Sequence, residues 1–177
     1  QELRGLEAQP DELEDRFYRE LEFGTGGLRG VIGAGSNRMN RYTVGKATQG
    51  LAEYILETAK GKAGKPSVVI AHDSRHFSPE SSLEAALVLA ANGIVAKLYP
   101  SLRTTPQLSF SVRHLQADGG IMVTASHNPP EYNGYKVYNQ EGGQLVPHEA
   151  ERVISLVQGV QSFSAIKQIT REEAEAQ

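Results

Sequence analysis

The chain has no cysteine, no long hydrophobic run and little excess charge of either sign. The absence of cysteine from the 177 residues excludes disulfide bonds, thiolate zinc sites and cysteine nucleophiles. The longest apolar run, residues 85–91, is far too short to cross a bilayer, and no signal-peptide pattern opens the chain. The 18 basic and 21 acidic side chains give a net charge of −3, which does not favour nucleic acid or an anionic membrane as a partner. We therefore expect a globular cytoplasmic protein.

Charge is nevertheless spread unevenly along the sequence. Residues 1–25 carry eight acidic and three basic side chains, whereas residues 26–75 carry eight basic and three acidic ones. The simplest interpretation is that each segment presents an ordinary solvated face. The alternative is an anion-binding site near the basic segment.

Helical and strand patterns alternate, which is typical of a layered α/β domain. The patterns predict helices over residues 10–23, 42–60, 78–91, 105–115 and 147–159, and strands over residues 67–71, 94–99, 120–124 and 135–138. Residues 31–35 form either a short strand or an extended loop. With right-handed crossovers, this order predicts a three-layer α/β/α fold whose mostly parallel sheet contains one antiparallel strand.

The two ends of the chain differ from its middle. Residues 1–23 predict an amino-terminal helical extension, and residues 24–160 hold the alternating pattern. Residues 161–177 have weak apolar spacing and end in a polar run, which is typical of a linker or a frayed end. We expect this segment to lead toward a second domain.

The most informative segment begins at the end of the predicted strand 120–124. Residues 124–138 read TASHNPPEYNGYKVY. Sheets of α/β domains bind ligands at the carboxyl ends of their strands, and the two prolines after Asn128 stiffen the loop that carries Ser126. A chain reversal at residues 133–134 returns Lys136 toward the same end of the sheet. The alternative interpretation is a polar turn with a solvated lysine.

Ser126 fits phosphoryl transfer better than acyl transfer. A serine hydroxyl needs a base or a metal to become a nucleophile, but His127 is the adjacent residue, and adjacent side chains diverge in extended backbone. The G-x-S-x-G pattern of many serine hydrolases is also absent. Phosphoryl transfer instead needs a positioned oxygen, cations around the phosphate and usually a divalent metal. Ser126, His127, Lys136 and a nearby arginine would meet the first two needs.

A glycine-rich segment is the second candidate. Residues 23–30 read FGTGGLRG, where glycines allow backbone N–H groups to approach an anion and Arg29 offers two parallel donors. It is not a dinucleotide fingerprint, because that pattern would need glycine at position 29. It is not a P-loop either, since Ala47 follows the pair Gly45–Lys46 and Asn40 occupies the first-glycine position. A flexible connector would explain the glycines but not the arginine.

A third segment, HDSRHFSP at residues 72–79, follows the predicted strand 67–71. His72 and His76 have the spacing of a metal pair only on a helix, and this segment is a loop. We therefore expect a structural role, in which Asp73 pairs with Arg75 within a turn that ends in a Ser78 helix cap.

Together these segments resemble the α-D-phosphohexomutase superfamily. TASHNP at residues 124–129 looks like the phosphoserine loop of that family, and residues 23–30 look like its amino-terminal motif. The strings GAGSNRMN at residues 33–40 and NGYKVY at residues 133–138 are most similar to the phosphoglucomutase/phosphopentomutase branch. The likeness implies that residues 24–160 are the first domain of such an enzyme.

The resemblance also implies roles for individual residues. Ser126 would carry a phosphoryl group, exchange it with a sugar phosphate through a bisphosphorylated intermediate, and provide one ligand to Mg²⁺. Arg29 and Lys136 would neutralise phosphate charge and bind substrate, and Lys136 would transfer a proton at the sugar hydroxyl. His127 would hydrogen-bond in the same cluster. A sugar bisphosphate of the glucose-1,6-bisphosphate type would prime the serine, and transfer would run between positions 1 and 6, or 1 and 5, of the sugar.

The sequence departs from the family in extent. Intact members have four domains, and the metal loop, the sugar-specificity loop and a further phosphate-binding loop belong to the other three. None of these appears here, so we expect this chain alone to bind Mg²⁺ weakly and to turn over little or no sugar phosphate. The alternative function is a non-catalytic phosphosugar-binding module that keeps the cationic pocket.

Overall fold

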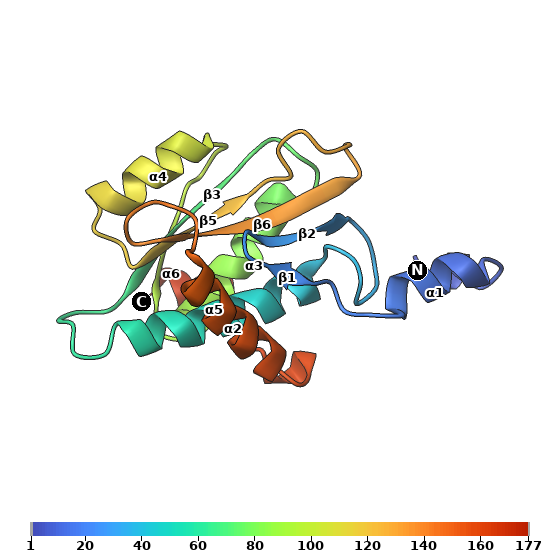
Figure 1. The fold of residues 1–177 in the computed structure, drawn as a ribbon, viewed down its shortest axis with the longest axis horizontal. Helices are drawn as coiled ribbons and strands as arrows, with labels where there is room; N and C mark the ends of the chain where they lie inside the picture. Colours follow the sequence, from blue (N-terminus) through green and yellow to red (C-terminus); the bar gives the residue numbers. More distant parts are fainter. Residues whose placement is uncertain (1, 177) are drawn as a thin grey trace.

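A six-stranded mixed sheet forms the middle layer of the computed structural model, which describes residues 2–176 (Figure 1). The strand order across the sheet is β1-β2-β6-β5-β3-β4. The strands are β1 (Phe23–Gly24), β2 (Gly27–Val31), β3 (Ser67–His72), β4 (Val95–Leu98), β5 (Gly119–Val123) and β6 (Tyr132–Asn139).

Helices cover both faces of this sheet (Figure 1). On one face lie α2 (Arg41–Thr58), α3 (Ser78–Ala91) and α5 (Pro147–Gly159), and on the other lies α4 (Thr105–His114). Strand β3 shows why an apolar core forms on each face of the sheet. Val68 and Ile70 belong to the core shared with α2 and α3, whereas Val69 and Ala71 belong to the core under α4. Side chains alternate across a strand, so a wholly buried strand needs an apolar layer on each side.

Helices α2 and α4 begin at side chains that cap them. Asn40 accepts hydrogen bonds from the backbone N–H groups of Tyr42 and Thr43 at the start of α2, and Thr104 forms a capping box at the start of α4. These residues satisfy N–H groups that have no partner inside the helix. The α/β layers and the principal helices predicted from the sequence are therefore confirmed.

The sheet is less parallel than the sequence predicts. Two of its strand pairings are parallel (β3–β4 and β3–β5), and three are antiparallel (β1–β2, β2–β6 and β5–β6). The expectation of one antiparallel strand is wrong, because the glycine-rich segment is a β1–β2 hairpin. Its Gly27 has a φ of +110° and lies so close to Tyr135 that an added Cβ would sit 1.9 Å from the Tyr135 carbonyl oxygen.

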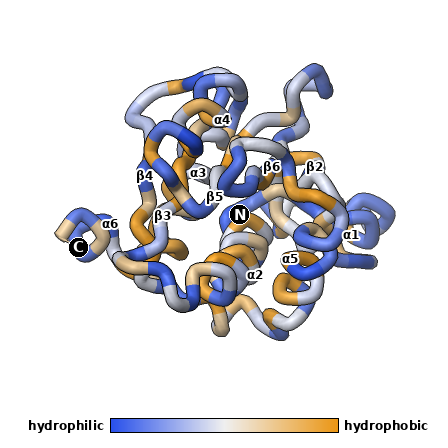
Figure 2. Tube along the Cα trace, turned by 60° about the vertical axis from the view of Figure 1, so that its left-hand side comes forward, coloured by the Kyte–Doolittle hydropathy of each residue, from blue (hydrophilic) through white to orange (hydrophobic). Residues whose placement is uncertain are grey.

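The amino-terminal extension lies beside the sheet layers (Figure 1). It contains the short helix η1 (Leu3–Leu6) and α1 (Pro10–Phe17), and α1 is mostly hydrophilic (Figure 2). The expected helix 10–23 ends at Phe17. Leu21, which the helical spacing includes, instead donates its N–H to Ser36 and packs on Gly30.

The carboxy-terminal segment contains η2 (Phe163–Ala165) and α6 (Arg171–Glu175). Gln168 donates a hydrogen bond to Glu84 on α3, and the backbone N–H of Lys167 donates one to Gln49 on α2. The segment is thus attached to both helices. Within residues 2–176, no helix combines the length and the hydropathy that crossing a membrane requires.

Candidate active site

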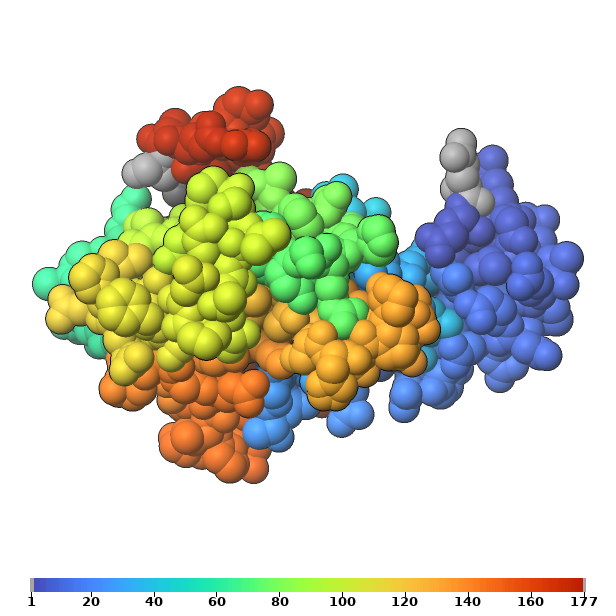
Figure 3. Space-filling model, turned by 90° about the horizontal axis from the view of Figure 1, so that it is seen from above, coloured from blue at the N-terminus to red at the C-terminus, as the bar shows by residue number. Residues whose placement is uncertain are grey.

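Ser126 lies in the exposed loop that follows β5, at the carboxyl end of that strand. Its φ is +55°, a left-handed conformation that side chains other than glycine adopt rarely. Seen from above, the loop is at the surface beside the segment that follows β3 (Figure 3). The structure therefore places Ser126, the candidate nucleophile, in a constrained but accessible position.

Lys136 reaches Ser126 from the neighbouring strand. It lies on β6 opposite Met122, and its Nζ donates a hydrogen bond of 2.8 Å to Ser126 Oγ. Strand β6 can approach this closely because Gly134 has no side chain. A Cβ there would lie 2.6 Å from the Thr124 carbonyl oxygen and 3.0 Å from that of Leu28.

Arg29 adds a second positive charge on the same face of the sheet. It lies on β2 opposite Gly134, two residues from Lys136, and its side chain is exposed. Burial lowers the pKa of Lys136, and the charge of Arg29 lowers it further, while Asp73 opposes both effects. The structure thus places Arg29 near Lys136, and Lys136 in contact with Ser126.

His127 is adjacent and exposed. Among the hydrogen bonds of residues 2–176, none involves its ring, so its expected hydrogen bond in the cluster stays a prediction. The ring is accessible for contact with a ligand.

Arg75 holds the serine loop through contacts that the sequence analysis does not predict. Its guanidinium donates to the carbonyl oxygens of Ser126 (2.8 Å), Asn128 (2.6 Å), Pro129 (2.8 Å) and Tyr132 (3.0 Å). It thereby connects the segment after β3 to the whole serine loop. The only available signal is an arginine two residues after an aspartate at a strand end.

Asp73 connects this arginine to the serine loop a second time. Its Oδ2 accepts a hydrogen bond of 2.5 Å from Thr124 and lies 3.6 Å from Arg75 Nε. The expected contact between Asp73 and Arg75 is therefore confirmed. The expected Ser78 cap is wrong: Ser78 is the first residue of α3, and its hydroxyl donates to Asp73 Oδ1 at 2.9 Å.

A divalent metal does not fit the residues of this chain alone. Within residues 2–176, no group of three or more His, Asp or Glu side chains could hold a metal ion. The Asp73 carboxylate, which contacts the loop through Thr124, already accepts hydrogen bonds from Thr124, Ser78 and the backbone N–H of Arg75. Ser126 Oγ would be a single ligand, whereas Mg²⁺ prefers six oxygen ligands.

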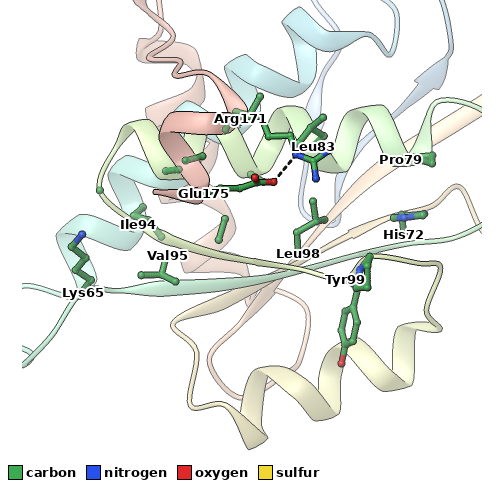
Figure 4. Close-up of a pocket in the computed structure, with 17 residues that line it drawn as sticks. Lys65, His72, Pro79, Leu83, Ile94, Val95, Leu98, Tyr99, Arg171 and Glu175 are labelled. Carbon is green, nitrogen blue, oxygen red and sulfur yellow. Dashed lines mark hydrogen bonds and ion pairs between the residues drawn. The ribbon is translucent and has the colours of Figure 1, made fainter. Parts of the chain in front are cut away.

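A separate cleft of about 600 Å³ lies between α3, β4 and α6 (Figure 4). Its walls are mostly apolar, with Leu83, Ile94 and Leu98 among them, and its charged pair Arg171–Glu175 is joined at 2.7 Å. Ser126, Lys136 and Arg29 do not line it. This cleft is therefore separate from the serine loop.

Residues 20–163 match the family described as phosphoglucomutase/phosphomannomutase, alpha/beta/alpha domain I. The chain belongs to this family. It is 44% identical over 157 residues to a phosphoglucomutase of Staphylococcus saprophyticus, and 48% identical over 132 residues to one of Staphylococcus haemolyticus. These matches cover 88% and 75% of this chain but only 28% and 23% of the relatives.

Solved structures of phosphoglucomutase/phosphomannomutase proteins agree. A protein of Thermus thermophilus, described as a proposed phosphomannomutase, superposes with a TM-score of 0.70 at 36% identity, over 78% of this chain and 30% of that one. A family protein of Burkholderia thailandensis shares the fold, with a TM-score of 0.60 at 24% identity over 80% of this chain and 30% of its own. The resemblance inferred from the sequence is confirmed.

Proposed function

We propose that this chain is the phosphoserine-bearing domain of a sugar-phosphate mutase, an intramolecular phosphotransferase. The hydrogen bond between Lys136 Nζ and Ser126 Oγ, with Arg29 on the same face, carries the proposal. Family membership supports it, and the relatives in Staphylococcus are phosphoglucomutases.

The two cations match the charge that Ser126 would bear. A phosphoserine carries about −1.5 to −2 charges near neutral pH and three strong acceptor oxygens. Lys136 is already one hydrogen bond from the ester oxygen, and Arg29 is able to donate two parallel hydrogen bonds to phosphate oxygens. Such donors stabilise the charge on the transferring group without rearrangement.

Transfer requires one proton to move. As the bond between phosphorus and Ser126 Oγ breaks, a bond forms between phosphorus and a sugar hydroxyl oxygen. The sugar hydroxyl loses a proton and Ser126 Oγ gains one. Lys136 lies within hydrogen-bond distance of Oγ, and its lowered pKa makes it a stronger proton donor than an ordinary lysine.

The remaining parts of the reaction lie outside this chain. The proposal assigns Mg²⁺ binding and selection of the sugar to further domains, and it takes residues 161–177 as the linker toward them. Residues 24–160 are the catalytic domain, residues 1–23 are an extension, and His127 contacts the sugar phosphate. A sugar bisphosphate of the glucose-1,6-bisphosphate type primes Ser126. Phosphoryl transfer runs between positions 1 and 6, or 1 and 5, of the sugar. We place the protein in the cytoplasm.

The proposal is tested by assaying conversion of glucose 1-phosphate to glucose 6-phosphate in the full-length protein. Ser126→Ala abolishes conversion, whereas Ser155→Ala, an exposed serine on α5, leaves it unchanged. Full activity of Ser126→Ala contradicts the proposal.

A further inference from the structure

Ser126 is held in a backbone conformation that needs support. Its φ of +55° lies in the left-handed region, where the Cβ of an L residue is crowded by the following carbonyl oxygen. A side chain stays in this region only when neighbouring groups determine its backbone. The serine loop must therefore contain groups that fix residue 126.

Both backbone polar groups of Ser126 have such partners. Its N–H donates a hydrogen bond of 2.9 Å to Thr124 Oγ1, and its carbonyl oxygen accepts one of 2.8 Å from Arg75 Nη2. The two contacts flank the Cα that carries the reactive hydroxyl. Together they fix the direction of the Ser126 Cα–Cβ bond, from which Oγ extends.

Arg75 holds the rest of the turn at the same time. Its other contacts are to the carbonyl oxygens of Asn128, Pro129 and Tyr132. Four hydrogen bonds to carbonyls at fixed angles suit a planar guanidinium, which has five N–H donors in a rigid arrangement. A lysine ammonium, with three donors on one nitrogen, cannot span these positions.

Asp73 orients both contacts from the end of β3. Its Oδ2 accepts the Thr124 hydroxyl proton, which leaves a Thr124 Oγ1 lone pair for the N–H of Ser126. The same oxygen is 3.6 Å from Arg75 Nε, and Thr124 is 5% exposed while the Arg75 side chain is 14% exposed. Since the Asp73 side chain is 26% exposed, the arrangement is a partly buried polar network rather than a fully exposed ion pair.

We infer that Arg75 and Thr124 are positioning residues for phosphoryl transfer. They hold Ser126 in its left-handed conformation and so place Oγ against Lys136. Neither residue contacts Oγ, so both act through the Ser126 backbone. The inference rests on the proposed function of Ser126. It adds two residues that act on the Ser126 backbone rather than on the sugar phosphate.

The structural part is tested by NMR on the 177-residue chain. Arg75→Lys and Thr124→Val are the test variants and are compared with wild type. Thr124→Ser keeps the hydroxyl, and Arg113→Ala, which removes an exposed arginine of α4, is the control. We expect Arg75→Lys and Thr124→Val to accelerate hydrogen exchange of the Ser126 amide about tenfold or more. Both also lose the nuclear Overhauser contact between Ser126 Hβ and Lys136 Hε. Thr124→Ser and the control keep wild-type behaviour.

The catalytic part is tested in the full-length protein with the same variants. A displacement near 1 Å reduces transfer about 100-fold, so Arg75→Lys and Thr124→Val lower kcat by about that factor with little change in KM. Thr124→Ser restores the rate.

These readouts separate the two claims. Unchanged amide exchange and Overhauser contact in Arg75→Lys and Thr124→Val overturn the inference, and so does a loss of both signals with an unchanged kcat. If both signals are lost but the wild-type full-length protein transfers no phosphoryl group, the proposed function fails while the positioning of Ser126 stands. If Arg75→Lys loses resonance dispersion across the whole spectrum, that variant is unfolded. The Thr124→Val variant then tests the inference by itself.

Discussion

At the scale of single residues, the pairing of Lys136 with Ser126 places a cation on an oxygen that has no negative charge of its own. The lysine is partly buried, lies near Arg29, and has a pKa below its ordinary value. A site that gathers positive charge around a hydroxyl is complementary to an anion placed there. A phosphoryl group on Ser126 is such an anion.

The contribution of Arg29 is testable through the pKa of Lys136. Arg29→Gln removes the neighbouring like charge, so the pKa of Lys136 rises toward its ordinary value. The titration of the Lys136 Cε resonance measures the shift. Arg113→Gln, on α4, leaves the titration unchanged, and an unshifted Lys136 in Arg29→Gln would show that the two charges do not interact.

Sequence reasoning finds the residues whose side chains would act in the proposed site and misses the arginine that binds the backbone of the serine loop. Ser126, Lys136 and Arg29 stand out because of their chemistry and motif spacing. Arg75 does not, because its four acceptors are main-chain carbonyls, which carry no sequence signal. Its spacing predicts only the local contact with Asp73, which the structure also contains.

At the scale of elements, strand β6 links the sheet to the site, because it pairs with both β2 and β5. Gly134 permits this packing. Gly134→Ala would place a methyl group against two carbonyl oxygens, so we expect a destabilisation of about 1–3 kcal/mol. Thermal unfolding measures this as a fall in Tm of roughly 3–10 °C.

Gly159 is the matched control for this substitution. A Cβ at Gly159 meets no atom within 4 Å, so Gly159→Ala leaves Tm nearly unchanged. Equal effects of the two substitutions would refute the role of close strand packing at Gly134.

We expect the stability of the fold around Glu84, which joins α3 to the carboxy-terminal segment, to depend on pH. Glu84 is buried, and burial raises its pKa despite Arg41 and Gln168. The folded state therefore favours protonated Glu84, and the stabilisation from this group is complete below pH 4.5 and is lost as pH rises through the folded-state pKa.

Glu84→Gln removes the buried charge and keeps the side-chain shape. We expect it to raise Tm at pH 7 by roughly 2–4 °C, the equivalent of about 1 kcal/mol, and to have a smaller effect at pH 4. Glu80→Gln, exposed on the first turn of the same helix, gives no such gain. An equal gain for Glu84→Gln at both pH values would contradict the assignment.

The elements that the sequence predicts well have local determinants. Helices α2 and α4 begin at capping boxes, and β3 and β5 are wholly buried and mostly apolar. The β1–β2 hairpin is missed because its pairing depends on the distant strand β6, against which Gly27 packs. The end of α1 is missed because Leu21 packs on Gly30 rather than continuing the helix.

At the scale of the whole molecule, the chain spans about a quarter of the staphylococcal phosphoglucomutases that it matches, 28% in one case and 23% in another. Residues 2–176 hold no group of three metal-ligating side chains. We therefore predict little or no conversion of glucose 1-phosphate by this chain alone in a coupled assay with Mg²⁺. Robust conversion would show that the residues of this chain suffice for the reaction.

The most direct test of the account is the intact mass of freshly purified full-length protein. A phosphoryl carrier contains a species heavier by HPO₃, because a phosphoryl group replaces one hydrogen, and its peptide fragments place that group on Ser126. Ser126→Ala lacks this species and Ser155→Ala retains it. A wild-type protein that stays unmodified even after incubation with glucose 1,6-bisphosphate, or that carries the group on another side chain, would contradict the claim and leave a module that only binds phosphosugars.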